Sequence, residues 1–435
     1  MLDLLKKECE IKIGLKIKTL GDCKFLSQAI LNAIDTDLNY NTLRRMWGLA
    51  PYVKPRLTTL NILSQFNGYN NYYHFANTFL YHKELRTQNQ IYKLIYKADD
   101  NELFRFIKKI KRTSADFPSL IISLSRELIY AKEFDLLDQL FTLKELEYES
   151  FSYTEALYIG NSIGLLIRKK PFQHFQLQKN TNFIRLVYLT FVDYSSISGY
   201  YSDWVRFISQ NTQLTDVLYF CEALTQLRNF LSLKPVKDTF RDLIQIPNLH
   251  PILLGRILSV RILAHNYKTI QSLLDPYFHR VCEKNLRKIE ISYELMITAI
   301  TSRNIELMNY IITQIDPTIQ LEFYYQKHHI NNYYLMCMFY YKVIKNKVEK
   351  KKFAQLFNIT ELQSSYEEYT TLLVLIFNYS ETNSLELKNT YKQNYLDLAQ
   401  QLNYPYFSED LLVDYFNSAN NELLLRDTNL LINKE

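Results

Sequence analysis

Glycine is scarce in this chain of 435 residues, which contains only eight. Four of them, Gly14, Gly21, Gly48 and Gly68, fall within the first 68 residues, so only four remain for the other 367. Sheet-rich folds and phosphate-binding loops use glycine for positive φ angles and for close approach of the backbone. The sequence therefore predicts an all-α fold. It also contains neither G-x-G-x-x-G nor G-x-x-x-x-G-K-[ST], the usual phosphate-loop patterns.

Cysteine and long apolar runs are equally rare. The five cysteines are scattered and include no C-x-x-C pair: Cys9, Cys23, Cys221, Cys282 and Cys337. An odd, dispersed set is typical of free thiols in a reducing compartment. The N-terminal segment lacks the apolar core of a secretory signal, and no apolar run is long enough to span a bilayer. We therefore expect a cytoplasmic protein that does not contact a membrane.

Motifs for catalysis or metal binding are missing as well. There is no H-E-x-x-H, and the one adjacent histidine pair, His328 and His329, would point about 100° apart on a helix. Residues 160–164 fit G-x-S-x-G, but that motif needs a strand before its serine, and the flanking residues here favour helix. Small residues that allow a close helix contact explain it better. We therefore expect no enzymatic activity, no catalytic residue, no metal and no cofactor.

What the chain does have is an uneven distribution of positive charge. The net charge is +6, and residues 1–80 hold ten Lys and Arg against six Asp and Glu, which amounts to +4. A basic surface raises the local concentration of a polyanion through long-range attraction. The alternative, a solvated surface that is basic but binds nothing, stays open at this point.

Apolar spacing and polar caps predict short helices in residues 25–79. The first has an apolar stripe of Phe25, Ala29, Ile30, Ala33 and Ile34, with Asp22 as its cap. After a turn at residues 35–37, Asn39 or Asn41 caps a helix over residues 42–47 that stops at Gly48. A helix from Thr58 or Thr59 stops at Gly68, and a last one opens after residues 70–71 and covers 72–79.

These residues resemble a known family. Asn-Tyr-Asn-Thr-Leu-Arg-Arg-Met-Trp-Gly (39–48), prolines at 51 and 55, and Thr-Leu-Asn-Ile-Leu-Ser-Gln-Phe-Asn-Gly-Tyr (59–69) resemble the helix-turn-helix domain of phage-repressor-type transcription regulators. In that family the segment equivalent to residues 40–47 is the recognition helix. The resemblance covers about fifty residues. The family's usual turn, a glycine followed by an apolar residue and a serine, is replaced here by Asp37-Leu38-Asn39.

The resemblance implies a set of DNA-contacting residues. Arginine can donate two hydrogen bonds to guanine, asparagine does the same for adenine, and threonine reaches a thymine methyl or a phosphate. Basic residues in the proline-bounded loop would neutralise backbone phosphates. The DNA-contact set is Asn41, Thr42, Arg44, Arg45, Lys54 and Arg56, whereas Leu43 and Trp47 are expected to face the core. The alternative is that Arg44 and Arg45 are ordinary surface residues of a domain that docks on protein.

The rest of the chain repeats a local motif. A polar residue precedes a helical pattern with apolar residues near positions 4, 5, 8 and 9, starting at Asp100, Glu133, Asn266 and Asn304. The steps of 33 and 38 residues are those of helix–turn–helix repeats, and four such units fit between Glu133 and Asn266. The sequence predicts an α-solenoid of helical hairpins similar to tetratricopeptide repeats. An irregular helical bundle is the alternative.

Together these patterns predict two domains, a helix-turn-helix-like domain at 1–85 and a helical-repeat domain at 88–435. The function that they favour is a non-enzymatic transcriptional regulator. Its N-terminal domain would bind duplex DNA, and its repeats would bind a peptide or protein or form a homodimer. The alternative is a protein-protein interaction scaffold whose N-terminal domain does not bind DNA.

Overall fold

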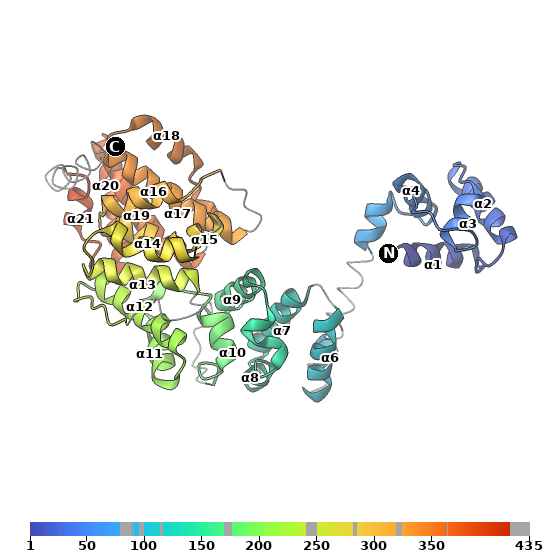
Figure 1. The fold of residues 1–435 in the computed structure, drawn as a ribbon, viewed down its shortest axis with the longest axis horizontal. Helices are drawn as coiled ribbons and strands as arrows, with labels where there is room; N and C mark the ends of the chain where they lie inside the picture. The colour runs from blue at the N-terminus through green and yellow to red at the C-terminus, as the bar shows by residue number, and fades with distance from the viewer. Residues whose placement is uncertain are drawn as a thin grey trace. The chain divides into compact units, whose positions relative to one another are not determined.

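The computed structural model describes residues 1–78, 89, 91–94, 100–113, 116–168, 176–240, 250–281, 285–318, 324–362 and 364–417 (Figure 1). Every regular element in these ranges is a helix and none is a strand, which confirms the predicted all-α class. No described helix is long and apolar enough to cross a membrane. The chain divides into two compact units, 1–113 and 114–435. The predicted boundary at 85–88 lies outside the described residues.

The N-terminal unit, residues 1–113, begins with short helices. They are α1 (Leu2–Ile13), α2 (Leu20–Ile34), α3 (Tyr40–Met46), α4 (Leu57–Phe66), a helical segment at 72–78, and α6 (Asp100–Thr113). Helix α2 starts earlier than its apolar stripe predicted, and its cap is Thr19 rather than Asp22. The Thr19 hydroxyl accepts from the Asp22 N–H at 3.3 Å, and the Asp22 carboxylate accepts from the Thr19 N–H at 2.8 Å. This reciprocal pair is a capping box.

A polar cap opens α3 and glycine stops follow α3 and α4, as the sequence predicted, but α4 begins at Leu57, before Thr58 or Thr59, and no side-chain hydrogen bond caps it. The Asn39 side chain accepts from the Asn41 N–H at 2.8 Å and opens α3. Gly48 and Gly68 follow α3 and α4 with φ of 76° and 94°, a conformation that costs glycine little. The last helical segment opens where Asn71 accepts from the His74 N–H at 2.9 Å. The local signals therefore set these ends to within two residues.

One side of each of these helices forms a single core. Its fully buried members come from α1 to α4 and the last segment and include Leu5, Leu26, Ile30, Leu43, Leu63 and Phe75. Trp47 packs against this core, and its Nε1 donates to Glu10 of α1 at 2.9 Å. The predicted orientation of α2 was wrong at Phe25, which is 54% exposed, because Cys23, Leu26 and Ile30 carry the buried face.

The C-terminal unit, residues 114–435, holds a longer series of helices. They are α7 (Phe117–Ala131), α8 (Phe134–Leu140), α9 (Tyr153–Arg168), α10 (Thr181–Phe183), α11 (Tyr200–Asn211), α12 (Thr215–Leu231), α13 (Pro251–Leu263), α14 (Ile270–Val281), α15 (Asn285–Thr301), α16 (Ile305–Gln314), α17 (Tyr324–Val343), α18 (Lys347–Leu356), α19 (Ser364–Glu381), α20 (Leu385–Leu402) and α21 (Glu409–Asp414). Short 3₁₀ turns at η1 (Lys144–Leu146), η2 (Tyr148–Ser150), η4 (Tyr194–Ser196) and η6 (Ile359–Glu361), and one π-helical turn, η3 (Ile184–Tyr188), interrupt the series.

Helices two apart in sequence pack on each other in the middle of this unit. Helix α13 packs on α15 and α15 on α17, while α14 packs on α16 (Figure 1). Helices α13, α15 and α17 begin at residues 251, 285 and 324, which are 34 and 39 residues apart. Consecutive hairpins are therefore layered here, with one helix of each hairpin in each layer.

Two of the four polar residues that begin the repeated motif are N-cap residues of helices in this unit. Glu133 is the N-cap of α8, and the Asn304 side chain caps α16 by accepting from the Leu307 N–H at 2.9 Å. The prediction was wrong at Asn266, since α14 begins only at Ile270 and the Asn266 amide donates to Asp238 instead, at 2.8 Å. Asp100 is the first residue of α6, which belongs to the N-terminal unit.

The G-x-S-x-G segment lies inside α9, where no strand precedes it. A Cβ on Gly160 would come within 2.2 Å of the Leu186 carbonyl oxygen, and one on Gly164 within 2.1 Å of the Phe191 ring. Both glycines therefore allow the segment at 186–191 to lie against α9. This is the close helix contact that the small residues predicted.

The described cysteines and the adjacent histidine pair are buried, and they do not form a metal centre. Cys9, Cys23, Cys221 and Cys337 are buried free thiols, and Cys282 lies outside the described residues. His328 and His329 are buried in α17, with His328 Nε2 2.7 Å from the Tyr293 hydroxyl. Within the described ranges no group of three or more potential ligands could hold a metal ion.

Candidate functional site

Helix α3 separates its apolar residues from those of the DNA-contact set. Leu43 and Met46 are buried in the core, at 0% and 2% exposure. Asn41, Arg44 and Arg45 stand three and four positions apart, the spacing that places side chains on one face of a helix. The Arg44 Nη1 donates to the Asn41 Oδ1 at 3.2 Å, so these two side chains are in contact. Asn41 and Arg45 are exposed and Arg44 is half-buried.

The remaining members of the set lie less favourably or farther along the chain. Thr42 is half-buried on α3, and Lys54 and Arg56 are exposed in the segment between α3 and α4. Arg56 is the N-cap residue of α4, but its side chain makes no capping hydrogen bond. In the described structure no hydrogen bond or ion pair joins the Lys54 or Arg56 side chain to α3. The structure thus brings Asn41 and Arg44 together but leaves the loop residues separate.

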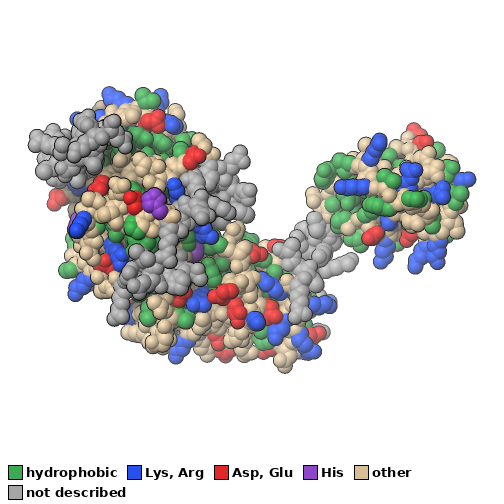
Figure 2. All heavy atoms as spheres, in the orientation of Figure 1, with side chains coloured by type: hydrophobic (Ala, Val, Ile, Leu, Met, Phe, Trp, Pro, Cys, Tyr) green, Lys and Arg blue, Asp and Glu red, His purple; other side chains and the backbone are tan. Residues whose placement is uncertain are grey.

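Among the described residues, the four basic members of the set have no acidic partner. Within residues 1–78 the only ion pair is the exposed contact between Lys6 and Asp3, at 3.3 Å. Arg44, Arg45, Lys54 and Arg56 therefore keep their positive charges uncompensated by neighbouring carboxylates. Figure 2 shows Lys and Arg side chains over several parts of the visible face of this unit.

Three other lysines of the N-terminal unit lie on aromatic rings, and sequence reasoning missed them. The Nζ atoms of Lys6, Lys12 and Lys24 lie 6.0, 4.8 and 5.4 Å from the ring centroids of Trp47, Phe66 and Tyr40. No short-range pattern in the sequence identifies these pairs, because the lysine of each pair lies on one helix and the ring on another helix or, for Trp47, at its C-cap. The fold therefore places these three lysines against aromatic rings.

Apolar side chains accompany the exposed cations. Tyr52 is 63% exposed, and Val53 and Leu57 are about half exposed, all in the same segment as Lys54 and Arg56. Isolated exposed apolar residues are common on protein surfaces, but several within six positions offer a contact area for an apolar surface. The segment therefore combines charge with exposed apolar area.

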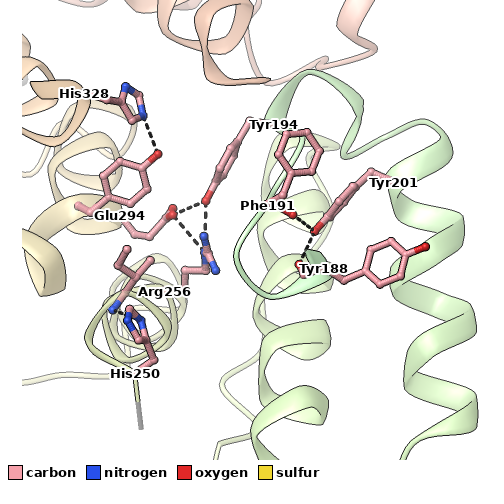
Figure 3. Close-up of polar contacts among 10 residues, drawn as sticks. Tyr188, Phe191, Tyr194, Tyr201, His250, Arg256, Glu294 and His328 are labelled. Atoms are coloured by element: carbon pink, nitrogen blue, oxygen red, sulfur yellow. Dashed lines mark hydrogen bonds and ion pairs between the residues drawn. The ribbon is translucent and has the colours of Figure 1, made fainter. Parts of the chain in front are cut away.

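A second candidate site lies in the C-terminal unit, around Arg256 of α13 (Figure 3). This arginine is only 8% exposed. Its Nε donates to the Glu294 carboxylate of α15 at 3.1 Å and to the Tyr194 hydroxyl of η4 at 3.2 Å, and Tyr194 in turn donates to Glu294. Burial raises the pKa of Glu294, although Arg256 beside it favours the ionised form. The Arg256–Glu294 ion pair and the Tyr194 hydroxyl thus connect α13, α15 and η4.

His250, directly before α13, contributes a second buried polar group. Its Nδ1 accepts from the Ile252 N–H at 3.2 Å and caps the helix, so in the neutral ring Nε2 carries the proton. That Nε2 is buried and has no hydrogen-bond partner in the described structure. Burial, with the nearby Arg287 and Arg256 guanidinium groups, lowers the pKa of His250 to about 3. The imidazole is therefore a neutral donor at neutral pH.

Sequence reasoning missed Arg256 and His250. Residues 251–260 read Pro-Ile-Leu-Leu-Gly-Arg-Ile-Leu-Ser-Val, and all ten are buried. A charged residue inside an otherwise apolar helix must find a buried partner, because an isolated charge in a protein interior is very costly. The sequence therefore indicates that Arg256 needs a buried partner. It does not identify that partner, because Glu294 and Tyr194 lie 38 and 62 positions away in the chain.

Comparison with known proteins gives no further assignment. No protein-family model, curated protein or solved structure matches this chain.

Proposed function

We propose that this protein is a non-enzymatic transcriptional regulator whose N-terminal unit binds duplex DNA. The observation that carries this proposal is the set of four basic side chains on and after α3, none of which has an acidic partner among the described residues. Cations without partners are available to displace the counterions of a phosphate backbone. A short helix anchored by Leu43 and Met46, with Asn41 and Arg45 exposed, supports the proposal.

The connection between α2 and α3 also supports it. The Ser27 hydroxyl of α2 donates to the Leu38 carbonyl at 2.6 Å, and Leu38 is buried in the core. Asp35 ends α2 in the left-handed conformation, with φ of 50°. The segment 35–39, which departs from the family's usual turn, is therefore fixed on both sides. A fixed turn gives α3 one orientation, as insertion into a groove requires.

The residue types assign roles within this proposal. Arg45 and Asn41 contact base edges, with Arg45 donating to guanine and Asn41 pairing with adenine. Arg44 holds the Asn41 amide, and Thr42, Lys54 and Arg56 contact phosphates, which supply affinity without sequence information. The C-terminal unit acts as a solenoid of helical hairpins that binds a peptide or protein or forms a homodimer. The layered packing of α13, α15 and α17 supports that part.

A second candidate function, a protein-docking scaffold, is favoured by the exposed apolar side chains of the same segment. Tyr52, Val53 and Leu57 are 63%, 54% and 46% exposed. DNA binding through phosphates has no use for such area, whereas protein interfaces are rich in aromatic residues. In this alternative Lys54 and Arg56 would contact acids at the rim of a protein interface.

Salt dependence of DNA binding separates the two candidates. Fluorescence anisotropy with a labelled duplex of about 30 base pairs is measured for the full chain over a range of salt concentrations. For DNA binding we expect log K to fall linearly with log salt, and Lys54→Ala with Arg56→Ala to reduce the slope by about 1 for each phosphate contact that is lost. Arg44→Ala with Arg45→Ala should weaken binding through the loss of base contacts.

The matched control is Lys7→Ala with Lys16→Ala, which removes the same charge from exposed positions of the same unit outside α3. DNA binding through α3 requires a clearly larger loss for the arginine pair than for the lysine pair. Equal losses would indicate a general effect of net charge. Absence of binding by the unaltered chain at low salt would leave the scaffold as the better interpretation.

A further inference from the structure

A cavity of about 700 Å³ lies inside the C-terminal unit, next to the buried ion pair. Its wall is built by η2, α9, η3 and the first turns of α12 and α13, all within the same compact unit. Volumes of 300 to 1,000 Å³ are typical of sites that enclose small organic molecules. The cavity therefore has the size of a ligand site, and its lining indicates which chemistry it accepts.

Two residues with hydrogen-bond donors, Arg256 and His250, line this cavity. Arg256 uses only its Nε for Glu294 and Tyr194, and its two terminal nitrogens have no hydrogen-bond partner in the described structure. The protonated Nε2 of His250 also lines this region without a partner. A buried donor that lacks an acceptor, such as the His250 Nε2, is costly, so an acceptor from outside the protein would stabilise it.

The geometry of these donors favours a carboxylate. The two terminal nitrogens of a guanidinium form a planar fork that matches the two oxygens of a carboxylate. Glu294 engages Arg256 from the Nε side and so leaves the fork unoccupied. The neutral imidazole of His250 adds a donor without adding a charge that would have to be desolvated.

The rest of the wall is apolar, and the mouth is polar. Phe151, Leu157, Phe220 and Leu253 line the cavity and offer contact to a hydrocarbon or aromatic body. The two acids that line it are close to water, since the side chains of Glu149 and Asp216 are 68% and 38% exposed, and both pair with Arg185. Arg185 offsets one of their two negative charges and solvent screens the other, which limits their repulsion of an anion bound at Arg256.

We propose that this cavity binds a small amphipathic molecule through a terminal carboxylate, which Arg256 and His250 hold while the apolar wall covers its body. Such a carboxylate occurs in a free organic acid and at the C terminus of a short apolar peptide. The proposal does not rest on DNA binding, because the cavity lies wholly within the C-terminal unit.

Isothermal titration calorimetry on the full chain without DNA tests the proposal. The probes are decanoate and decanamide, and an apolar tripeptide with a free C terminus and its C-terminal amide. We expect at least one carboxylate probe to bind about ten-fold or more tightly than its amide. The carboxylate probe that binds more tightly shows whether the cavity favours a free organic acid or the C terminus of a peptide. If the cavity holds only water, no probe should give a heat of binding at about 1 mM. That result would overturn the proposal.

Two variants locate the binding. His250→Asp keeps an acceptor for the Ile252 N–H but places a negative charge beside the ligand carboxylate, so binding should be lost. Arg256→Lys keeps a cation for Glu294 but removes the fork, so affinity should fall about ten-fold. The matched control is His279→Asp, the same change at an exposed position of α14.

Binding that survives both His250→Asp and Arg256→Lys would contradict the proposal, and so would equal losses in His250→Asp and His279→Asp. Circular dichroism establishes that each variant is folded. If the variants do not fold, the comparison of each carboxylate with its amide on the unaltered chain still decides between acceptance and rejection.

Discussion

The two units of this protein treat charged residues in opposite ways. In residues 1–78 the basic side chains of α3 and the following loop are on the surface, and no acidic residue there pairs with them. In the C-terminal unit Arg256, Arg261 and Arg185 are mostly buried and each contacts at least one carboxylate at 3.1 to 3.3 Å. The first arrangement leaves charge available to an external anion, whereas the second uses charge to fix the packing of helices.

This difference separates two consequences of replacing an arginine. A surface cation without a partner contributes little to folding, so its loss should affect binding alone. A buried arginine leaves behind an uncompensated carboxylate, so its loss should affect folding first. The chain has one tryptophan for each unit, Trp47 and Trp204, so Trp204→Phe and Trp47→Phe backgrounds report the unfolding of each unit separately.

The largest effect is expected at Arg256. Arg256→Met should destabilise the C-terminal unit by about 3–5 kcal/mol, because Glu294 would remain buried without its cation. Arg45→Ala should change the stability of the N-terminal unit by less than about 0.5 kcal/mol. Urea unfolding followed by the fluorescence of Trp204 and Trp47 measures both.

A double variant is the control for this prediction. Arg256→Met combined with Glu294→Leu removes both charges and should recover most of the lost stability. If the double variant is as unstable as Arg256→Met alone, the loss comes from packing and not from an unpaired charge.

The next effect tests the apolar side of α3. Leu43→Ala should destabilise the N-terminal unit by about 2–5 kcal/mol, since Leu43 is fully enclosed in its core. The C-terminal unit should unfold at an unchanged urea concentration. Leu57→Ala, at a position 46% exposed in α4, is the matched control and should cost far less. Similar losses in both variants would mean that Leu43 does not anchor α3.

Acid should weaken the C-terminal unit through its buried histidines. Burial lowers the pKa of His250 and of His329 to about 3 in the folded chain, below the unfolded value of about 6.5. Between these values the unfolded state binds more protons, so stability falls as pH falls, by about 1.4 kcal/mol per pH unit for each imidazole. Unfolding monitored by Trp204 between pH 7 and 5 measures the slope.

Buried acids act in the opposite direction in the same unit. Burial raises the pKa of Asp193, Glu290 and Glu294, so these groups stabilise the fold as pH falls. His250→Asn keeps a capping acceptor and removes the contribution of this histidine. The slope of the unfolding free energy against pH should then fall by up to about 1.4 kcal/mol per pH unit, which corresponds to one proton. An unchanged slope in His250→Asn would contradict this assignment.

The smallest effect concerns the cap of α2. Thr19→Ala removes the hydroxyl of the capping box and should destabilise the N-terminal unit by about 1 kcal/mol. Thr58→Ala is the control, because Thr58 is exposed in the first turn of α4 and is not its cap. Thermal unfolding followed by Trp47 fluorescence compares them, and equal shifts would count against a specific cap at Thr19.

Particular residues mark how far sequence reasoning could go. Asn39, Gly48 and Gly68 were recognised because a cap or a left-handed stop involves residues within a few positions of one another. The cap at Thr19 is equally local, but an apolar stripe that begins at Phe25 predicts a later start for α2 and so does not include it. The face assigned to Phe25 was wrong because the spacing allowed more than one stripe, and contacts with α3 and α4 selected the one that carries Leu26 and Ile30.

The sequence by itself determined the all-α class, most helix ends in the N-terminal domain, and the excess of basic residues there. These properties depend on short-range rules of backbone conformation and on composition. Only the tertiary structure decided that Arg256 pairs with Glu294, that Arg256 and His250 line a cavity, and that Arg44, Arg45, Lys54 and Arg56 have no acidic partner among the described residues. Those outcomes depend on which helices pack together, and the free energy of that packing is distributed over residues far apart in the chain.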